Sequence, residues 1–175
     1  MSVERDPASE PDPRRPAAAT SIPWVAALVR RHLAIGWWGL LVFLTLGIAI
    51  EGFHGFKTRW YADVGNELRR TMLRLAHAHG GMLAIVHLLF AGTLGLMRNA
   101  TPRRMELASR FLTVALVLVP GGFLLGGFYL YETDPGLGVF LVPIGAAFLF
   151  AGVLLTALAQ KANSEQGPGD RDESR

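Results

Sequence analysis

The chain has 175 residues, of which 51% are hydrophobic and 18% charged, and its formal net charge at pH 7 is +3. The charged residues gather at the two ends and in two short interior blocks. This segregation suits a bilayer, and basic residues beside apolar runs are typical of headgroup anchors rather than of a nucleic-acid partner. The absence of cysteine excludes disulfides, thiol catalysis and thiolate metal ligands.

The two ends of the chain have the composition of disordered tails. Residues 1–21 are rich in proline, alanine and charge, and they contain no apolar core of a signal peptide. Such a segment cannot bury enough apolar surface to fold, and residues 161–175 are similar. Residues 22–32 (IPWVAALVRRH) are too short to cross a bilayer and predict an interfacial helix. In that helix His32, beside Arg30 and Arg31, is expected to be an ordinary interfacial residue.

Four apolar stretches are long enough to cross a membrane, which takes about 20 helical residues for a core of ~30 Å. They cover approximately residues 33–56, 72–97, 107–131 and 137–159. The last two are apolar on all sides, whereas a soluble bundle needs helices with a polar outer face. The sequence therefore predicts an all-α fold, an integral membrane four-helix bundle over residues 33–160 in contact with the lipid bilayer.

The lysines and arginines near the span ends indicate the orientation of this bundle. The side of the two termini carries a small excess of them, which predicts that both termini are cytoplasmic. The frequent alanine, glycine and arginine favour a bacterial source, and hence a multi-pass protein of a bacterial inner membrane. The basic residues on the opposite, outer side are Lys57, Arg59, Arg69, Arg70 and Arg74.

The first two spans carry ionisable residues, which are costly inside a membrane and mark candidate functional sites. Glu51 and His54 lie on one stripe of the first span. With a rise of about 1.5 Å per residue, they are expected at the depth of His77 and His79, near the outer side. His77 shares the small-residue face of its helix and should face Glu51 and His54. His79 points about 200° away, toward another helix or the headgroups, and His87 lies about 12 Å deeper than His79.

Two cofactors suit this Glu/His cluster. Glu51, His54 and His77, with His79 and His87 in reserve, form a candidate site for Zn, Cu or Fe. A pair of facing histidines, His54 with His77 or His79, could instead ligate a b-type haem. Four arginines of the outer side could then neutralise the haem propionates: Arg59, Arg69, Arg70 and Arg74.

Functions without a cofactor are also compatible with the cluster. Its members could carry protons or take part in solute transport. They could equally be interhelical hydrogen bonds in a structural or accessory subunit, worth about 0.6 kcal/mol each. No nucleophile–base pair or phosphate-binding loop is recognisable, so the sequence does not decide whether the chain is an enzyme.

The third span contains Pro120 beside Gly121 and Gly122, which predicts a kinked or flexible helix. Broken helices of this kind line the substrate sites of some transporters. The spacing of Gly122 and Gly126 indicates with equal weight a close contact between helices. That contact could lie within the chain, in a homo-oligomer or with a partner membrane protein.

Overall fold

The computed structural model describes residues 22–62, 65, 67–97, 101–131 and 134–165. The elements are α1 (Pro23–Gly55), α2 (Arg59–Ala62), α3 (Glu67–Leu96), α4 (Pro102–Phe128), a 3-10 turn η4 (Leu137–Phe140) and α5 (Leu141–Glu165). Four helices (α1, α3, α4 and η4 with α5) are long and apolar enough to cross a membrane. This confirms the predicted helical fold and the number of long helices for the described chain. The tail predicted at 1–21 and residues 166–175 of the tail predicted at 161–175 lie outside the described residues, whereas residues 161–165 are helical.

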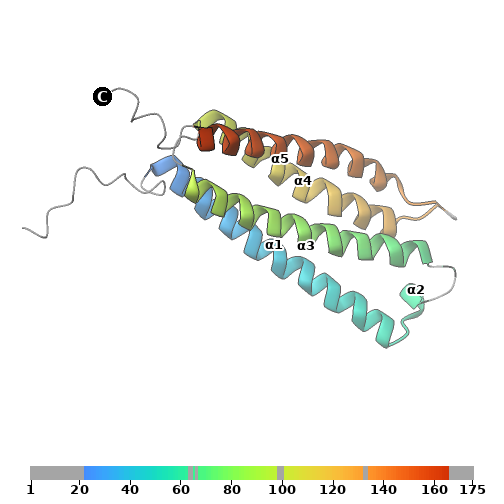
Figure 1. Cartoon of the computed structure of the whole chain (residues 1–175). Coiled ribbons are helices and arrows are strands. Elements are labelled where there is room, and N and C mark those ends of the chain that lie inside the picture. Colours follow the sequence, from blue (N-terminus) through green and yellow to red (C-terminus); the bar gives the residue numbers. More distant parts are fainter. Residues whose placement is uncertain (1–21, 63–64, 66, 98–100, 132–133, 166–175) are drawn as a thin grey trace, which may run out of the picture.

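The long helices pack in chain order, each one on the next, as Figure 1 shows. α3 and α4 are central: 39% and 44% of their most apolar stretches are buried, against 11% for α1 and for α5. The outer helices α1 and α5 do not pack along each other within the described residues. The bundle is therefore open, and two of its helices present most of their surface to the outside.

The four helices converge at the end where the described chain begins and finishes (Figure 1). One apolar core there takes residues from every long helix, among them Val25 of α1, Leu94 of α3, Met105 of α4 and Ala159 of α5. Toward the opposite end α1 diverges from α3, and the short α2 lies between them. The bundle is thus closed at the terminal end and open at the α2 end.

Helix α1 is longer than the sequence predicts. It begins at Pro23, a residue whose fixed φ suits the first helical position, and it continues without a break to Gly55. The interfacial helix expected at 22–32 and the first span are therefore one helix in the structure. Helix α5 likewise continues to Glu165, past the predicted end at 159.

Helix α2 packs between the ends of α1 and α3 at the open end. Its Tyr61 is fully buried and packs with Ile50 of α1 and Leu73 of α3. Arg69 and Arg70 of α3 donate hydrogen bonds to the backbone carbonyls of Trp60 (2.9 Å) and Tyr61 (3.2 Å). This single turn fixes the connection between α1 and α3 and keeps their ends separated.

Glycines allow close approach in each of the three helix pairs that pack in chain order. Between α1 and α3, Gly36 faces Leu88, Gly47 faces His77, and Gly80 faces the ring of Phe43. Side chains at such positions would hold the helices apart, so small residues there bring the two backbones together.

The glycine pair of α4 packs within the chain. Gly122 faces Val142 of α5, and Gly126 faces Val139 of η4. Helix α4 remains helical through Pro120, which is buried. The glycine spacing therefore corresponds to a packing contact of α4 with η4 and α5, and the kink or flexibility at Pro120 stays a prediction.

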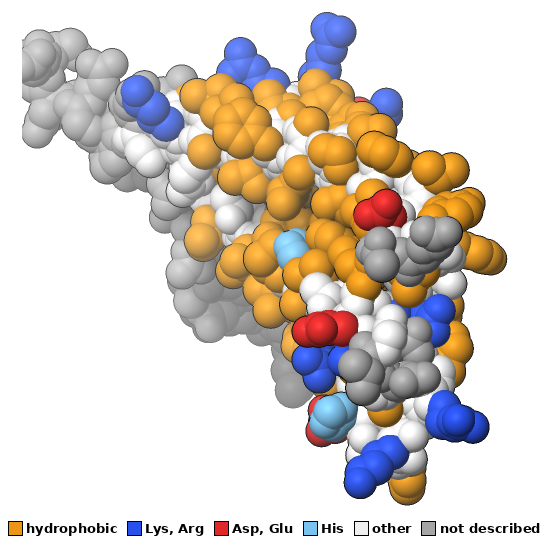
Figure 2. Space-filling model, turned by 90° about the vertical axis from the view of Figure 1, so that its right-hand side faces the viewer, with side chains coloured by type: hydrophobic (Ala, Val, Ile, Leu, Met, Phe, Trp, Pro, Cys, Tyr) orange, Lys and Arg blue, Asp and Glu red, His pale blue; other side chains and the backbone are white. Residues whose placement is uncertain are grey.

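The outward surface of the outer helices is apolar. Figure 2 views the molecule from its α2 end, where charged side chains lie over the end face and hydrophobic side chains cover the flanks. A soluble protein rarely leaves so many large apolar side chains in contact with water. The exposed large hydrophobic residues in the middle of α1 and α5 are Trp37, Trp38, Leu41, Val42, Leu44, Ile48, Ile144, Phe150, Val153, Leu154 and Leu158.

The glycine contact between α1 and α3 can be tested at two neighbouring positions. A Cβ at Gly80 would collide with the ring of Phe43, whereas a Cβ at Gly81 meets open space. We expect Gly80→Val to lower the free energy of unfolding by about 1–3 kcal/mol, the usual effect of overpacking. Gly81→Val should change it little. Unfolding of both variants in detergent, followed by circular dichroism, measures the difference, and equal losses would contradict the assigned contact.

Candidate functional site

Two histidines meet inside the closed half of the bundle. His32 of α1 and His87 of α3 are both fully buried, and their Nδ1 atoms lie 2.7 Å apart, at hydrogen-bond distance. The rings are stacked, with centroids 4.7 Å apart and an interplanar angle of 21°. On the other side of His32, Nε2 lies 2.7 Å from Oγ of the buried Ser109 of α4. We call these three residues the His–His–Ser cluster.

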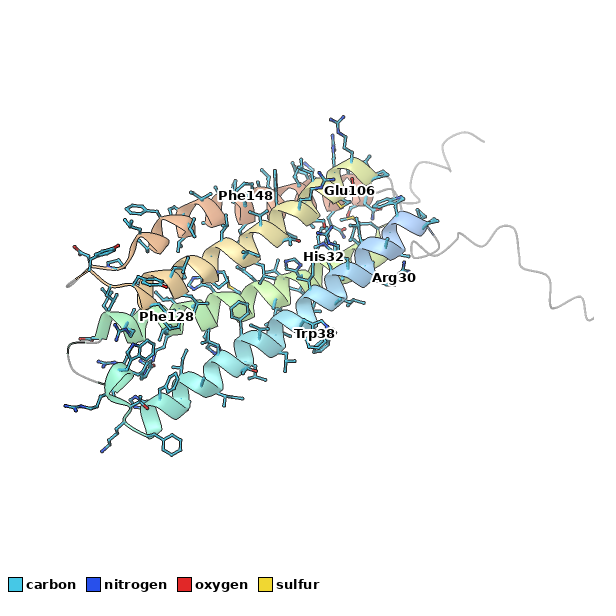
Figure 3. All side chains as sticks on the ribbon, turned by 180° about the vertical axis from the view of Figure 1, so that it is seen from behind. Arg30, His32, Trp38, Glu106, Phe128 and Phe148 are labelled. Carbon is cyan, nitrogen blue, oxygen red and sulfur yellow. The ribbon has the colours of Figure 1, made fainter. Side chains whose placement is uncertain are left out.

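The pattern of buried residues on each helix places this cluster. On α1, Val25, Leu28, His32 and Gly36 are buried at intervals of three and four residues, so they form one face of the helix. His87 lies on the corresponding face of α3, and Figure 3 shows His32 turned toward the neighbouring helices while Trp38 points outward.

Hydrogen-bond geometry limits the protons of this cluster. A bond between two Nδ1 atoms needs one donor and one acceptor, so the neutral rings carry their protons on different nitrogens. If His87 donates, Nε2–H of His32 donates to Ser109 and Nε2 of His87 has a lone pair. If His32 donates, the hydroxyl of Ser109 donates to Nε2 of His32, and Nε2 of His87 carries a proton.

In both arrangements Nε2 of His87 has no hydrogen bond to the other two members of the cluster. It is buried and makes no hydrogen bond of good geometry with the described residues, although the backbone of Leu112 interacts with this imidazole as a hydrogen-bond partner. An unsatisfied buried polar atom costs about 1–3 kcal/mol. Such an atom in a native structure calls for an explanation, and a catalytic role or an exchangeable ligand is one.

The position of His32 corrects an expectation from the sequence. His32 is not an interfacial residue, because the continuous helix α1 turns it inward while Arg30 and Arg31 remain exposed. The signal for this was its spacing of four residues from Gly36, on the small-residue stripe of the helix. Ser109 was also missed, because a serine in an apolar helix has no charge that would single it out.

The predicted outer residues are only partly brought together. His77 faces α1 as expected: its Nδ1 donates to the backbone carbonyl of Phe43 at 2.7 Å. His77 lines a cavity of about 340 Å³ together with Glu51 and Arg74. His54 lines a different cavity, and both Glu51 and His54 are exposed.

His54 and His77 do not share one depth. His77 is level with the turn between Phe43 and Gly47, which precedes His54 by two to three helical turns, or roughly 10–16 Å at 1.5 Å per residue. The reason is that α3 begins at Glu67, earlier than predicted, so that His77 lies well inside the helix rather than near its outer end.

The remaining two predicted histidines have protein neighbours. His79 packs its ring against Phe123 of α4, with centroids 4.9 Å apart, and its Nδ1 donates to the carbonyl of Leu75 at 2.9 Å. Of its two predicted environments, it has the one formed by another helix. His87, for which the sequence predicted a position deeper than His79, is fully buried within the His–His–Ser cluster.

The geometry can be compared with the needs of a metal or haem. Among the described residues, no three histidine, aspartate or glutamate side chains lie close enough together to hold a metal ion. Two metal–nitrogen bonds of 2.0–2.1 Å at a tetrahedral angle separate the nitrogens by roughly 3.3 Å, whereas the Nδ1 atoms of His32 and His87 are 2.7 Å apart. These rings fit a shared proton and leave no room for an iron between them. A cofactor at Glu51, His54 and His77 stays a prediction.

The contribution of the cluster to stability can be measured on α4. Ser109→Ala removes the hydroxyl that bonds to His32 and should lower the free energy of unfolding by roughly 0.6–1.7 kcal/mol, the range for polar contacts between membrane helices. Thr113→Val is the matched control, because the Thr113 hydroxyl bonds to the carbonyl of Ser109 in its own helix. Unfolding in detergent compares the two. A loss in Thr113→Val as large as that in Ser109→Ala would contradict an interhelical role for the serine.

Comparison with known proteins gives no relative whose role could be transferred to this site. No protein family, no curated protein and no solved structure matches the chain. Its function is therefore argued from the geometry of its own residues.

Proposed function

We propose that this chain is a multi-pass protein of a bacterial inner membrane with both termini in the cytoplasm. Four long apolar helices and the exposed hydrophobic surface of α1 and α5 support the membrane location. The excess of basic residues near the terminal side supports the orientation. In this arrangement the His–His–Ser cluster belongs to the cytoplasmic half of the bundle, about 14 Å along α1 from Pro23.

Within this protein, we propose that the cluster transfers protons. The observation that carries the proposal is the row of bonded atoms from Nε2 of His87, through the two Nδ1 atoms, to Nε2 of His32 and Oγ of Ser109. Its three members come from three helices and are fully buried. Buried ionisable groups in membrane helices commonly mark proton relays.

Imidazole suits this task because a proton can bind one ring nitrogen while another leaves from the second. A proton arriving at Nε2 of His87 forms an N–H bond there. The proton on Nδ1 of His87 then moves to Nδ1 of His32. The proton on Nε2 of His32 passes to Ser109, while the hydroxyl proton of Ser109 leaves to a water molecule that must enter the bundle, because all three residues are buried. One proton enters and one leaves, and the rings return to their first tautomers by turning or exchanging protons.

The main alternative is a structural or accessory subunit whose histidines only join helices. A pure packing contact leaves Nε2 of His87 without a hydrogen bond of good geometry, and an apolar side chain there would avoid the penalty of a poorly satisfied buried atom. A relay needs that atom, since it is the place where the proton enters. The alternative predicts no proton movement and is distinguished by the following experiment.

Proton flux into liposomes tests the relay directly. With an imposed potential and a pH-sensitive dye inside, the reconstituted full-length chain should carry protons. We expect His87→Phe and His32→Phe to reduce the flux to that of empty liposomes, because each removes a ring from the row of bonds. Ser109→Ala should reduce it less, since a water molecule can replace a hydroxyl.

The control is His79→Phe, the same substitution at a histidine of α3 that lies outside the cluster and contacts Phe123; this variant should retain the flux. Melting in detergent identifies variants that fail to fold. No flux in the unsubstituted protein would overturn the relay in favour of the accessory role. Loss of flux in Glu51→Gln but not in His87→Phe would show that protons pass through the outer residues and not through the His–His–Ser cluster. A Soret band or stoichiometric metal, lost in His54→Ala and His77→Ala, would support the cofactor predicted from the sequence.

A further inference from the structure

Two adjoining cavities open at the α2 end, and they share Arg74. The larger, about 710 Å³, lies between the end of α1, α2 and the first turns of α3. The smaller, about 340 Å³, runs down the side of α1 facing α3. Because Arg74 lines both, the two cavities adjoin at this side chain. We call them together the depression, with an end-face part and a flank part.

The end-face part is basic. Among the described residues, its lining includes three arginines, a lysine and a histidine, against the one carboxylate of Glu67, together with the uncharged Thr71 and Ala62. A cavity with this balance of charge favours an anion, and arginine binds phosphate with particularly good geometry. The basic residues are His54, Lys57, Arg59, Arg70 and Arg74.

The flank part is mainly apolar. Leu44, Ile48 and Ile50 line it, and Gly47 leaves space between them. Ile48 is 65% exposed, so the flank part opens outward rather than into the core. Its polar members, Glu51, Arg74 and His77, accompany this apolar wall, and the carboxylate of Glu51 sets a limit on how far an anionic group can descend.

We infer that this depression binds a phospholipid with an anionic headgroup. The phosphate would lie among the basic residues of the end face, and an acyl chain would follow the flank past Leu44 and Ile48. Neither part alone points to a lipid, but an anionic head and an apolar tail joined at Arg74 match the two adjoining surfaces. The inference rests on the proposed membrane location and is independent of proton transfer.

The charge distribution of the sequence supports this assignment. The orientation proposed from the span ends leaves a group of basic residues on the outer side, where the positive-inside rule does not favour them. A phosphate headgroup bound by these residues would compensate their positive charge on the outer side. Basic pockets between membrane helices on the cytoplasmic side bind anionic lipid headgroups, and we infer the same chemistry for this pocket on the outer side.

Lipid binding to the delipidated full-length protein in detergent provides the test. Phosphatidylglycerol is titrated, and the shift of the melting temperature gives its affinity. It should bind more tightly than phosphatidylcholine with the same acyl chains. Arg74→Gln should lower the affinity for phosphatidylglycerol about fivefold, the effect of ~1 kcal/mol per basic residue near an anionic lipid. Ile48→Trp fills the flank part and should lower the affinity for the lipid. It should not lower the affinity for glycerol phosphate, which lacks the acyl chains.

The matched controls are Arg104→Gln and Ile144→Trp, which change an exposed arginine of α4 and an exposed isoleucine of α5 far from Arg74 in the sequence. Both should bind phosphatidylglycerol like the unsubstituted protein. If Arg104→Gln lowered the affinity for phosphatidylglycerol as much as Arg74→Gln does, the effect would come from the net charge of the protein, and the proposed site would be wrong. Competition by glycerol phosphate or inorganic phosphate at the lipid's own concentration would show a site for free anions, and binding of haem with a Soret band sensitive to Arg74→Gln would show a haem site. Either result would overturn the assignment to a lipid.

Discussion

The close approach of α1 and α3 is the contact on which the internal arrangement depends. Glycines on both helices, Gly36 and Gly47 on α1 and Gly80 on α3, let each backbone come near the side chains of the other. At that distance an imidazole of α3 reaches α1: His77 reaches the carbonyl of Phe43, and His87 reaches the ring of His32. With bulkier residues at the glycines, these polar contacts between the helices would be lost together, because a hydrogen bond weakens steeply with distance.

The polar groups inside the bundle follow from this packing and differ at its two ends. At the closed end, residues of four helices form the core, and the buried His32, His87 and Ser109 bond to each other. At the α2 end, the wedge of Tyr61 holds α1 away from α3, and the charged residues line open cavities instead. A buried row of hydrogen bonds suits the transfer of a proton, whereas an open basic depression suits the binding of an anion. One pair of helices therefore provides two different chemical environments.

The sequence predicted the features that depend on composition and on the periodicity of a single helix. The number of long helices, the orientation of His77 toward α1 and the contact of His79 with another helix are of this kind. The partner of His32 could not be predicted in this way. It depends on whether α1 is continuous and on which residues of α3 lie opposite His32. Neither property is encoded in the residues near position 32. Ser109 became part of the site only through the position of a third helix.

The pairing of α1 with α3 also shows why depth, estimated from the ends of apolar stretches, misplaced His54. His32 lies opposite His87, and Phe43 lies opposite His77, so eleven residues along α1 correspond to ten along α3. Continued for another eleven residues, this register brings His54 opposite the first turn of α3. The cavity that His54 shares with Glu67, Arg70 and Thr71 agrees with that position. His54 therefore belongs with the arginines of the open end, where an imidazole adds to the attraction for an anion, and not with the histidines that are bonded inside the bundle.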